Sequence, residues 1–542
     1  MLKGFLYTVE DDIVTITGHD GDVPDLVIPS FIVHDGKELP VKAIGENAFS
    51  NREDIVTVTV LEGTERICDF AFLNCMNLKS LALPDSLLRI GDMAFENCSS
   101  LTFLDIPDSV RCLGQSAFSD CESLSELRLG RGLTSVGKFA FFRCTSLTEV
   151  DIPLGVRDIR DHAFAGCSSL ERVSIPDGVH TIDRMAFSNC ISLRLVILGH
   201  GVRTIGGNTF DGCSSLVLID LPNTLINIGG NAFRDCSSLA MMVISDSVSS
   251  IGDGAFTFCT GMKGVMIGRS LAHLGKLPFE GCDSLEMVSV SEDNTIFRSI
   301  DGVLYDKELS RVLLCPAGKV GRVDVPDSIY ELGDSCFMMC SGLDAVGLPE
   351  SLESIGSYAF RGCDGLSELE IPDAVDTIGD MAFSSCSSLK HIHIPASVMS
   401  IGDSTFSGCT SLEGITVDGS NTDFTSVDGI LFSKDMQRLI RYPPMRSGKE
   451  YSVPDGVTVI DKSAFMKCPD LETVHIPGSV RMIDKFAFAG NVGLRRVVFY
   501  DLDPESVIDG SAFSLPYTER VYEYDGKEYT DVESLLKDRS MD

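Results

Sequence analysis

The sequence predicts a β-rich solenoid of about 20 coils of 23 residues, with one short strand and one compact turn per coil and a cap at each end. Two observations support this fold class. A 23-residue unit recurs through most of the 542 residues, as in 146–167, 169–190 and 192–213. Each unit is also too short to close a globule, so it must bury its apolar residues against the units before and after it.

Phenylalanine and cysteine mark the period. Phenylalanine recurs every 23 residues from Phe49 to Phe279 and again from Phe337 to Phe406. Most of the 19 cysteines follow the same spacing, beginning at Cys75. Zinc sites need close pairs of ligands, and only Cys336 and Cys340 come near such a spacing. We therefore expect a ladder of reduced, buried thiols and not a metal site or a disulfide framework.

Each unit has three parts. The segment L-x-x-V-x-I-P predicts a strand with alternate residues facing inward, ended by proline. The segment V-x-x-I-G predicts a second short apolar edge, where glycine permits a tight bend. The segment A-F-x-x-C-x-x-L predicts a compact turn that places the phenylalanine in the core.

The repeated unit C-x-x-L-x-x-[IV]-x-[IL]-P-x-x-[VL]-x-x-I-[GD]-x-x-A-F extends over about residues 45–500. This pattern resembles the BspA-like, or Treponema pallidum-type, leucine-rich repeat family. The resemblance implies a leucine-rich repeat solenoid. It also implies an interaction role, because members of the family look like adhesins and other interaction proteins, often on the surface of host-associated microbes.

Some segments depart from the period. Residues 294–305 and 421–432 resemble each other, and each contains an Asp-Gly pair typical of a hairpin turn. A further Asp-Gly pair stands near the carboxyl terminus at Asp525. The predicted organisation is 1–44 N-terminal β-hairpin cap, 45–290 regular repeats, 291–336 enlarged repeat with a β-hairpin, 337–417 regular repeats, 418–464 second enlarged repeat with a β-hairpin, 465–500 regular repeats and 501–542 C-terminal cap.

Charge and hydropathy restrict the partners. The chain has 79 acidic and 44 basic residues, a net charge of −35, so it repels phosphate backbones and we expect no nucleic-acid partner. No stretch approaches the ~18 apolar residues of a membrane span. Residues 1–12 carry no secretory signal, because the apolar run is short and acidic residues follow it. We expect a cytoplasmic protein as the chain is written, or a cell-surface or secreted protein if a signal precedes Met1.

The outward strand positions, which flank the central valine of each unit, carry the candidate site. In one early coil these positions are Glu149 and Asp151, but five consecutive coils from Leu195 to Met287 place apolar residues there. A contiguous exposed apolar patch marks an interaction site, and methionine adapts to varied partners. Alternatively, the caps or hairpins cover this patch, or the sheet tolerates it. The predicted partner-binding residues are Leu195, Ile197, Leu218, Met241, Val243, Met266 and Met287.

The sequence predicts no catalytic, cofactor-binding or metal-binding residue. It contains no G-x-S-x-G or H-E-x-x-H pattern. His391 and His393 share a strand face but have no third ligand nearby, so we interpret them as surface residues. Glu368 and Glu370 resemble a glycosidase pair, but they lie on a regular strand and not in a predicted pocket.

We therefore predict a monomeric, non-enzymatic protein-interaction or adhesion module that binds a protein or glycan partner on the exposed sheet. Two alternatives stay open. The chain could be a structural or cell-envelope assembly protein, although caps that block strand edges argue against end-to-end stacking. It could also be a glycan hydrolase that acts through its acidic face.

Overall fold

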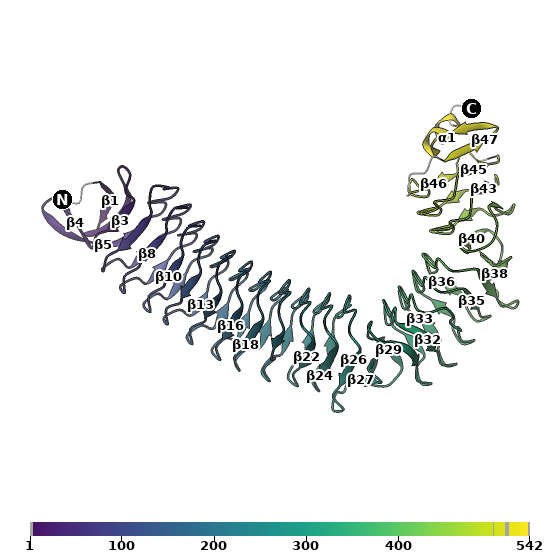
Figure 1. Ribbon diagram of the computed structural model, residues 1–542, viewed down its shortest axis with the longest axis horizontal. Helices are drawn as coiled ribbons and strands as arrows, with labels where there is room; N and C mark the ends of the chain where they lie inside the picture. The colour runs from purple at the N-terminus through teal and green to yellow at the C-terminus, as the bar shows by residue number, and fades with distance from the viewer. Residues whose placement is uncertain (1–3, 502, 504, 515–519, 540–542) are drawn as a thin grey trace. The chain divides into compact units, whose positions relative to one another are not determined.

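A computed structural model describes residues 4–501, 503, 505–514 and 520–539 and confirms the predicted solenoid (Figure 1). It has about 22 coils of about 23 residues, slightly more than predicted. The chain divides into two compact units. The first unit extends to Leu285 and includes Val290–Ile296, whereas the second contains Glu286–Ser289 and continues from Phe297.

The first strand of each coil comes from the L-x-x-V-x-I segment, and together these strands form what we call the front sheet. Where neighbouring strands pair, they do so in parallel and mostly at an offset of 23 residues, so Val150 lies opposite Val173 and Val173 opposite Val196. In the first unit these strands are β3 (Asp25–Ile28), β6 (Thr57–Val60), β8 (Ser80–Ala82), β10 (Phe103–Asp105), β12 (Glu126–Arg128), β14 (Glu149–Asp151), β16 (Arg172–Ile175), β18 (Leu195–Leu198), β20 (Leu218–Ile219), β22 (Met241–Ile244) and β24 (Gly264–Ile267).

The front sheet of the second unit follows the same rule. Its strands are β30 (Gly321–Asp324), β32 (Leu343–Gly347), β35 (His391–Ile394), β37 (Gly414–Val417), β41 (Glu450–Ser452), β43 (Thr473–Ile476), β45 (Arg496–Phe499) and β47 (Val521–Tyr524). Strand β26 (Met287–Val290) lies where the two units divide the chain.

The second apolar edge of each coil is itself a two-residue strand, and these strands form the back sheet. Their isoleucines stack in register, as in Ile159, Ile182 and Ile205. In the first unit the strands are β7 (Arg66–Ile67), β9 (Arg89–Ile90), β11 (Cys112–Leu113), β13 (Ser135–Val136), β15 (Asp158–Ile159), β17 (Thr181–Ile182), β19 (Thr204–Ile205), β21 (Asn227–Ile228), β23 (Ser250–Ile251) and β25 (His273–Leu274). In the second unit they are β31 (Glu331–Leu332), β33 (Ser354–Ile355), β34 (Thr377–Ile378), β36 (Ser400–Ile401), β42 (Val459–Ile460), β44 (Met482–Ile483) and β46 (Val507–Ile508).

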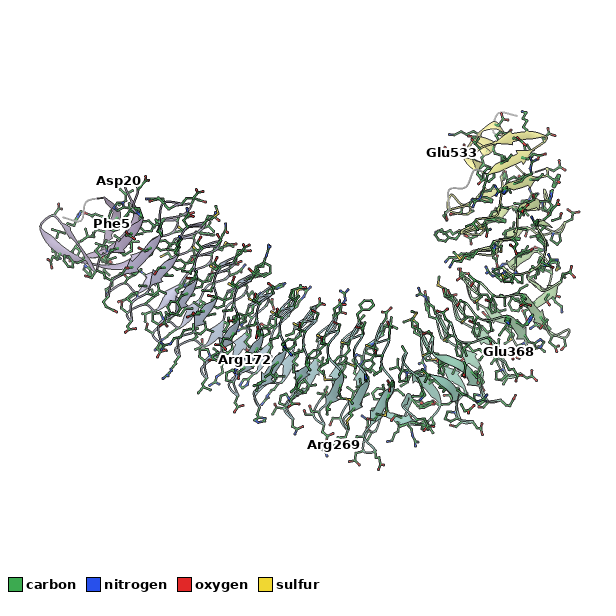
Figure 2. The ribbon with its side chains drawn as sticks, viewed as in Figure 1. Phe5, Asp20, Arg172, Arg269, Glu368 and Glu533 are labelled. Atoms are coloured by element: carbon green, nitrogen blue, oxygen red, sulfur yellow. The ribbon has the colours of Figure 1, made fainter. Side chains whose placement is uncertain are left out.

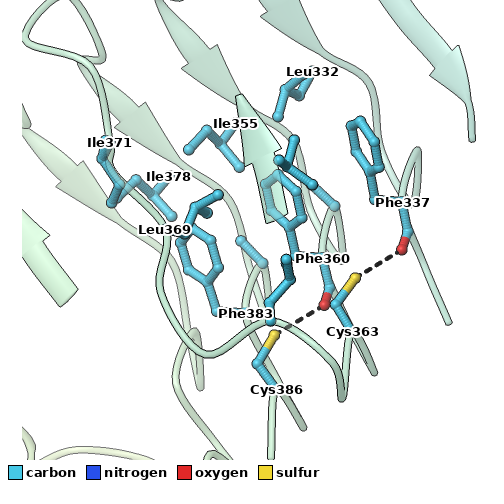
Figure 3. Packing of buried hydrophobic residues seen from close by; sticks show 14 of the residues in the cluster. Leu332, Phe337, Ile355, Phe360, Cys363, Leu369, Ile371, Ile378, Phe383 and Cys386 are labelled. Carbon is cyan, nitrogen blue, oxygen red and sulfur yellow. Dashed lines mark hydrogen bonds between the residues drawn. The ribbon is translucent and has the colours of Figure 1, made fainter. Parts of the chain in front are cut away.

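The A-F-x-x-C segment forms the turn that joins the back sheet to the next front strand. Its phenylalanines are buried and stack on one another along the solenoid (Figure 3). The ring of Phe360 lies 5.1 Å from that of Phe337 and 5.5 Å from that of Phe383, with interplanar angles of 12° and 4°. The Phe360 amide also donates to the carbonyl oxygen of Ala382 at 2.7 Å. Stacked rings and coil-to-coil backbone bonds together hold the turns in register.

Each enlarged repeat adds an antiparallel hairpin. The first consists of β27 (Phe297–Ile300), β28 (Val303–Asp306) and β29 (Arg311–Leu314), and the second of β38 (Phe424–Val427), β39 (Ile430–Ser433) and β40 (Arg438–Arg441). Their turns contain Asp301-Gly302 and Asp428-Gly429, and all four residues have positive φ angles between 48° and 81°. Strands β29 and β40 then pair in parallel with β31 and β42, so the chain rejoins the back sheet.

Hairpins also occur towards both termini. Strands β1 (Phe5–Glu10) and β2 (Ile13–His19) pair antiparallel, as do β4 (Phe31–His34) and β5 (Lys37–Ile44), and β5 continues into the back sheet through β7. Near the carboxyl terminus, β48 (Lys527–Tyr529) pairs antiparallel with β47 and is followed by α1 (Val532–Arg539). Among the described residues, no helix is long and apolar enough to cross a membrane.

Candidate functional site

The front sheet presents alternate side chains outward, because successive residues of a strand point to opposite faces. In β14, Val150 is buried in the core, whereas Glu149 and Asp151 on either side of it are exposed. In most coils the two positions around the central residue therefore meet solvent, although Gly264 and Val498 are buried.

The predicted apolar residues occupy these outward positions. Leu195 is half-buried and the others are about half exposed. Their exposed fractions are 47% for Ile197, 52% for Leu218, 50% for Met241, 55% for Val243, 49% for Met266 and 48% for Met287.

Strand pairing brings the apolar residues of the first unit side by side in two groups, one on β18 and β20 and the other on β22 and β24. Leu195 lies opposite Leu218, and Val243 lies opposite Met266. Met241 lies opposite Gly264, which has no side chain to extend the surface. We define the apolar stripe as Leu195, Ile197, Leu218, Met241, Val243 and Met266. Met287, at the start of β26, belongs to the second unit.

Charged side chains border the stripe on its amino-terminal side. Arg172 on β16 lies between Leu195 of the stripe and Glu149 of the preceding coil (Figure 2). One carboxylate, Asp220, is exposed within the same coil as Leu218. The surface is therefore an apolar centre with a charged margin, a composition typical of protein-binding surfaces.

The first unit also has a second outward feature, which the sequence analysis did not select. Phe103 on β10 is 48% exposed and lines an open depression of about 820 Å³. Asp105 and Arg128 line the same depression and approach each other to 3.4 Å. The sequence signal that could have identified this depression is Phe103, a single aromatic residue at an outward strand position.

Each front-sheet histidine makes polar contacts with a different set of side chains. His391 Nε2 lies 3.6 Å from the carboxylate of Glu413, and His393 Nδ1 lies 3.0 Å from the hydroxyl of Thr416. His475 contacts the Glu450 carboxylate at 2.5 Å and the Tyr500 hydroxyl at 2.8 Å. No group of three or more histidine, cysteine, aspartate or glutamate side chains within the described residues is suited to hold a metal ion.

The carboxylates of Glu368 and Glu370 are exposed, and both line an open depression of about 690 Å³ on the second unit. Glu368 also forms an isolated parallel bridge with His391. Arg322 and His393 line the same depression. The two carboxylates thus lie in a broad, open surface and not in an enclosed cleft that would exclude water.

The predicted cysteine ladder is confirmed. All 19 cysteines are free, and those of the ladder are buried, including Cys340. Burial raises the pKa of the Cys167 thiol, for example, to about 12. Most ladder thiols donate to the phenylalanine carbonyl 26 residues earlier, as Cys386 donates to Phe360 at 3.0 Å (Figure 3). After the two enlarged repeats the partner differs: Cys340 donates to the carbonyl oxygen of Cys315 at 3.6 Å, and Cys468 to that of Tyr442 at 4.0 Å. These cysteines are therefore part of the core and not a reactive site.

Comparisons with known proteins agree with this architecture. A family model described as BspA type leucine rich repeat region (6 copies) matches residues 42–171, 157–286, 316–434 and 445–519. A solved leucine-rich repeat protein from Bacteroides ovatus is 26% identical, with a TM-score of 0.52, over 77% of this chain and 93% of that chain. The leucine-rich repeat protein of T. pallidum is 30% identical over 40% of this chain and 89% of that chain, with a TM-score of 0.31. No curated protein matches the chain.

Proposed function

The chain belongs to the BspA-type leucine-rich repeat family, and from this premise we propose that it is a non-enzymatic interaction module that binds a protein partner through the apolar stripe. Family membership supports the general role, since leucine-rich repeats are scaffolds whose exposed sheets present side chains in register. The stripe supports the particular surface.

The observation that carries the proposal is the exposure of the stripe. Five of its side chains are 47–55% exposed on the outward face of four consecutive front strands, where the coils before them present charged residues such as Glu149. Covering a half-exposed aliphatic side chain stabilises a complex by roughly 1 kcal/mol on the area scale. Five such residues, held on a regular solenoid face, provide a substantial part of the binding energy of a typical protein complex.

A protein partner fits the stripe better than a glycan does. Sugar hydroxyls need hydrogen-bond partners when they are covered, and leucine, isoleucine, valine and methionine side chains offer none. Methionine and leucine side chains instead adapt to apolar side chains of varied shape. Adhesion, in which the partner belongs to a host surface, is the finer form of this proposal and requires that the protein be displayed outside the cell.

The test compares partner capture by three forms of the chain. Met241→Asp combined with Met266→Asp places two carboxylates on the stripe at exposed positions, where they do not disturb the core. The control combines Leu154→Asp and Val320→Asp, which change two apolar residues that are 81% and 74% exposed and lie outside the stripe. Circular dichroism verifies that all three forms are folded.

We expect the stripe variant to lose a captured protein that the wild type and the control both retain. Equal capture by all three forms would eliminate the stripe as the binding surface. A glycan array with the same three forms tests the glycan alternative. Light scattering over a range of concentrations tests assembly: self-association that the stripe variant abolishes would favour a structural role instead.

A further inference from the structure

A cavity interrupts the back sheet of the second unit between β36 and β40. The back-sheet ladder β31–β33–β34–β36 ends at β36, and the strand that resumes it, β40, pairs only with β42 on its other side and with β39 of its own hairpin. We attribute this interruption to the short segment that links β40 to the following turn. Tyr442 follows the back-sheet residue Leu439 by three residues, whereas Phe465 follows the aligned Ile460 by five. The shortened link leaves a space of about 160 Å³ beside the preceding turn.

Two backbone amides beside this space lack the hydrogen bonds that a regular coil makes. In a regular coil the turn amides bond to the next coil, as Met381 donates to Asp403 at 2.9 Å and Phe383 to Thr405 at 3.0 Å. The equivalent amides of Ser404 and Phe406 would reach towards the coil that has the shortened link, and both residues line the cavity. Within the described residues, neither amide has a hydrogen-bond partner. Buried amides without a partner are rare in folded proteins.

Arg441 lines the same cavity and is only 2% exposed. Its guanidinium donates to the carbonyl oxygens of Ser463 at 2.6 Å and Met466 at 3.3 Å, whereas its buried Nε has no partner among the described atoms. In the described part of the chain, no carboxylate forms an ion pair with it. A buried arginine stays charged, and a buried charge is costly unless an opposite charge compensates it.

The other charged groups around the cavity compensate one another. Arg438 holds the Asp461 carboxylate with bonds of 3.1 and 2.8 Å, and Lys462 lies 4.0 Å from Asp403. Arg441 therefore provides the excess positive charge of the cavity. The hydroxyl-bearing residues that line it are Ser400, Ser404, Thr405, Ser407 and Ser463, with Ser404 Oγ 3.2 Å from Ser463 Oγ.

The first enlarged repeat shows that the architecture does not require this arginine. Its segment Arg311-Val-Leu-Leu-Cys-Pro316 aligns with Arg438-Leu-Ile-Arg-Tyr-Pro443, which places Leu314 at the position of Arg441. Both segments form the third strand of their hairpins and rejoin the back sheet in the same way. A buried charge that the fold does not need points to a ligand.

We propose that the cavity between β36 and β40 binds a small inorganic oxyanion of the phosphate or sulfate kind. Arg441 supplies the compensating charge, and the amides of Ser404 and Phe406 and the serine hydroxyls supply neutral donors. Charge-assisted hydrogen bonds from guanidinium and backbone amides are the usual means of holding such anions. This site is independent of the apolar stripe, which lies on the first unit.

The test is calorimetric titration of the full chain with sodium phosphate and with sodium sulfate, against sodium chloride at matched ionic strength. Arg441→Leu removes the charge and introduces the residue type of the aligned position 314. Lys462→Glu reverses a charge at the edge of the cavity without changing a fully buried side chain, so it serves if the first variant does not fold. Arg269→Leu is the control, since it removes one exposed arginine from the first unit (Figure 2).

We expect the wild type and Arg269→Leu to bind one phosphate or sulfate per chain, and chloride to give no saturable signal. Arg441→Leu and Lys462→Glu should each weaken the oxyanion affinity at least about tenfold. The first variant removes the guanidinium donor, and the second places an additional carboxylate at the edge of the cavity, which repels an anion. The proposal is overturned if the wild type shows no saturable oxyanion binding, or if a folded Arg441→Leu or Lys462→Glu binds as tightly as the wild type.

Discussion

The thiol of Cys363 donates a hydrogen bond to the carbonyl oxygen of Phe337, 26 residues earlier in the chain, at 3.0 Å (Figure 3). The same carbonyl oxygen also accepts a hydrogen bond from the amide of Cys340 at 3.2 Å. The thiol therefore occupies the second lone pair of the Phe337 carbonyl oxygen. Cysteine is the small residue that fills this site and also donates a weak hydrogen bond. Burial raises the pKa of the Cys363 thiol and keeps it protonated, so it remains a donor at neutral pH.

Replacing Cys363 by alanine removes both the sulfur volume and this hydrogen bond. We expect the local free energy of unfolding to fall by about 1–2 kcal/mol, the combined cost of a small cavity and one lost bond. Hydrogen exchange of the amides around 337–386 measures it, because repeat proteins open coil by coil. The exposed Cys112 is the matched control, and its change to alanine should cost less than about 0.5 kcal/mol. Equal effects at both positions would contradict a structural role for the thiol bond.

Thiol reactivity should separate the ladder from the rest of the cysteines. Cys112 is exposed and Cys68 is half-buried, whereas the other cysteines are buried. Because the thiolate is the reactive form and needs solvent access, a disulfide reagent at pH 8 should label Cys112 quickly and Cys68 slowly. The remaining thiols should react only after unfolding in denaturant. Rapid labelling of further cysteines in the folded chain would show that coils open readily.

The same burial predicts a loss of stability at alkaline pH. Burial raises the pKa values of Cys121 and Cys167 to about 12 each, above the ordinary thiol value of 9.0. Above the unfolded pKa, the unfolded chain releases protons that the folded chain retains, so the stabilising contribution is complete below about pH 9 and is lost as pH rises towards 12. Between these two pKa values, each thiol lowers the free energy of unfolding by up to about 1.4 kcal/mol for every unit of increase in pH.

The urea midpoint at pH 8, 9 and 10 measures this alkaline loss. It should fall above pH 9, and the variant Cys121→Ala with Cys167→Ala should show a shallower decline than the wild type. A midpoint that is level up to pH 10, or a decline that the variant leaves unchanged, would disprove the assignment to the ladder thiols.

The fold could be predicted because the 23-residue period is strict, so that equivalent positions in different coils have the same environment. A single coil such as 146–167 specifies which residues face inward, and stacking then fixes the parallel register. The second strand of each coil could not be separated from a bend, since only two residues, such as Thr181 and Ile182, form ladder bonds. The thiol bonds were also missed, because their 26-residue spacing joins different positions of the repeat and is not visible in the pattern itself.

The sites were harder to predict, because they depend on departures from the period. The outward positions of the apolar stripe could be assigned from alternation alone, as Met241 and Val243 show. The cavity beside Arg441 arises from a link that is two residues shorter than usual, and its effect depends on the geometry of the neighbouring coil. Charge compensation around it involves residues from two coils, such as Arg438 and Asp461, and required the structure.

The side chain of Asn421 ties the second hairpin to the coil before it, which predicts a large effect of its loss. It is 1% exposed, donates to the carbonyl oxygens of Pro395 at 2.8 Å and Val398 at 2.9 Å, and accepts the amides of Asp423 and Phe424. Asn421→Leu leaves four backbone groups without these partners, so we expect a local cost of at least about 3 kcal/mol.

Hydrogen exchange should then accelerate throughout β38 and β39 in Asn421→Leu, and little in the front strand β35, which precedes the hairpin. The control Thr422→Ala alters an exposed neighbour and should leave exchange within about threefold of the wild type. Phe424, three residues after Asn421, begins β38 and lines the cavity. A loosened hairpin should therefore also weaken oxyanion binding. Unchanged protection of β38 in Asn421→Leu would mean that the strand pairing alone holds the hairpin and that the buried asparagine is dispensable.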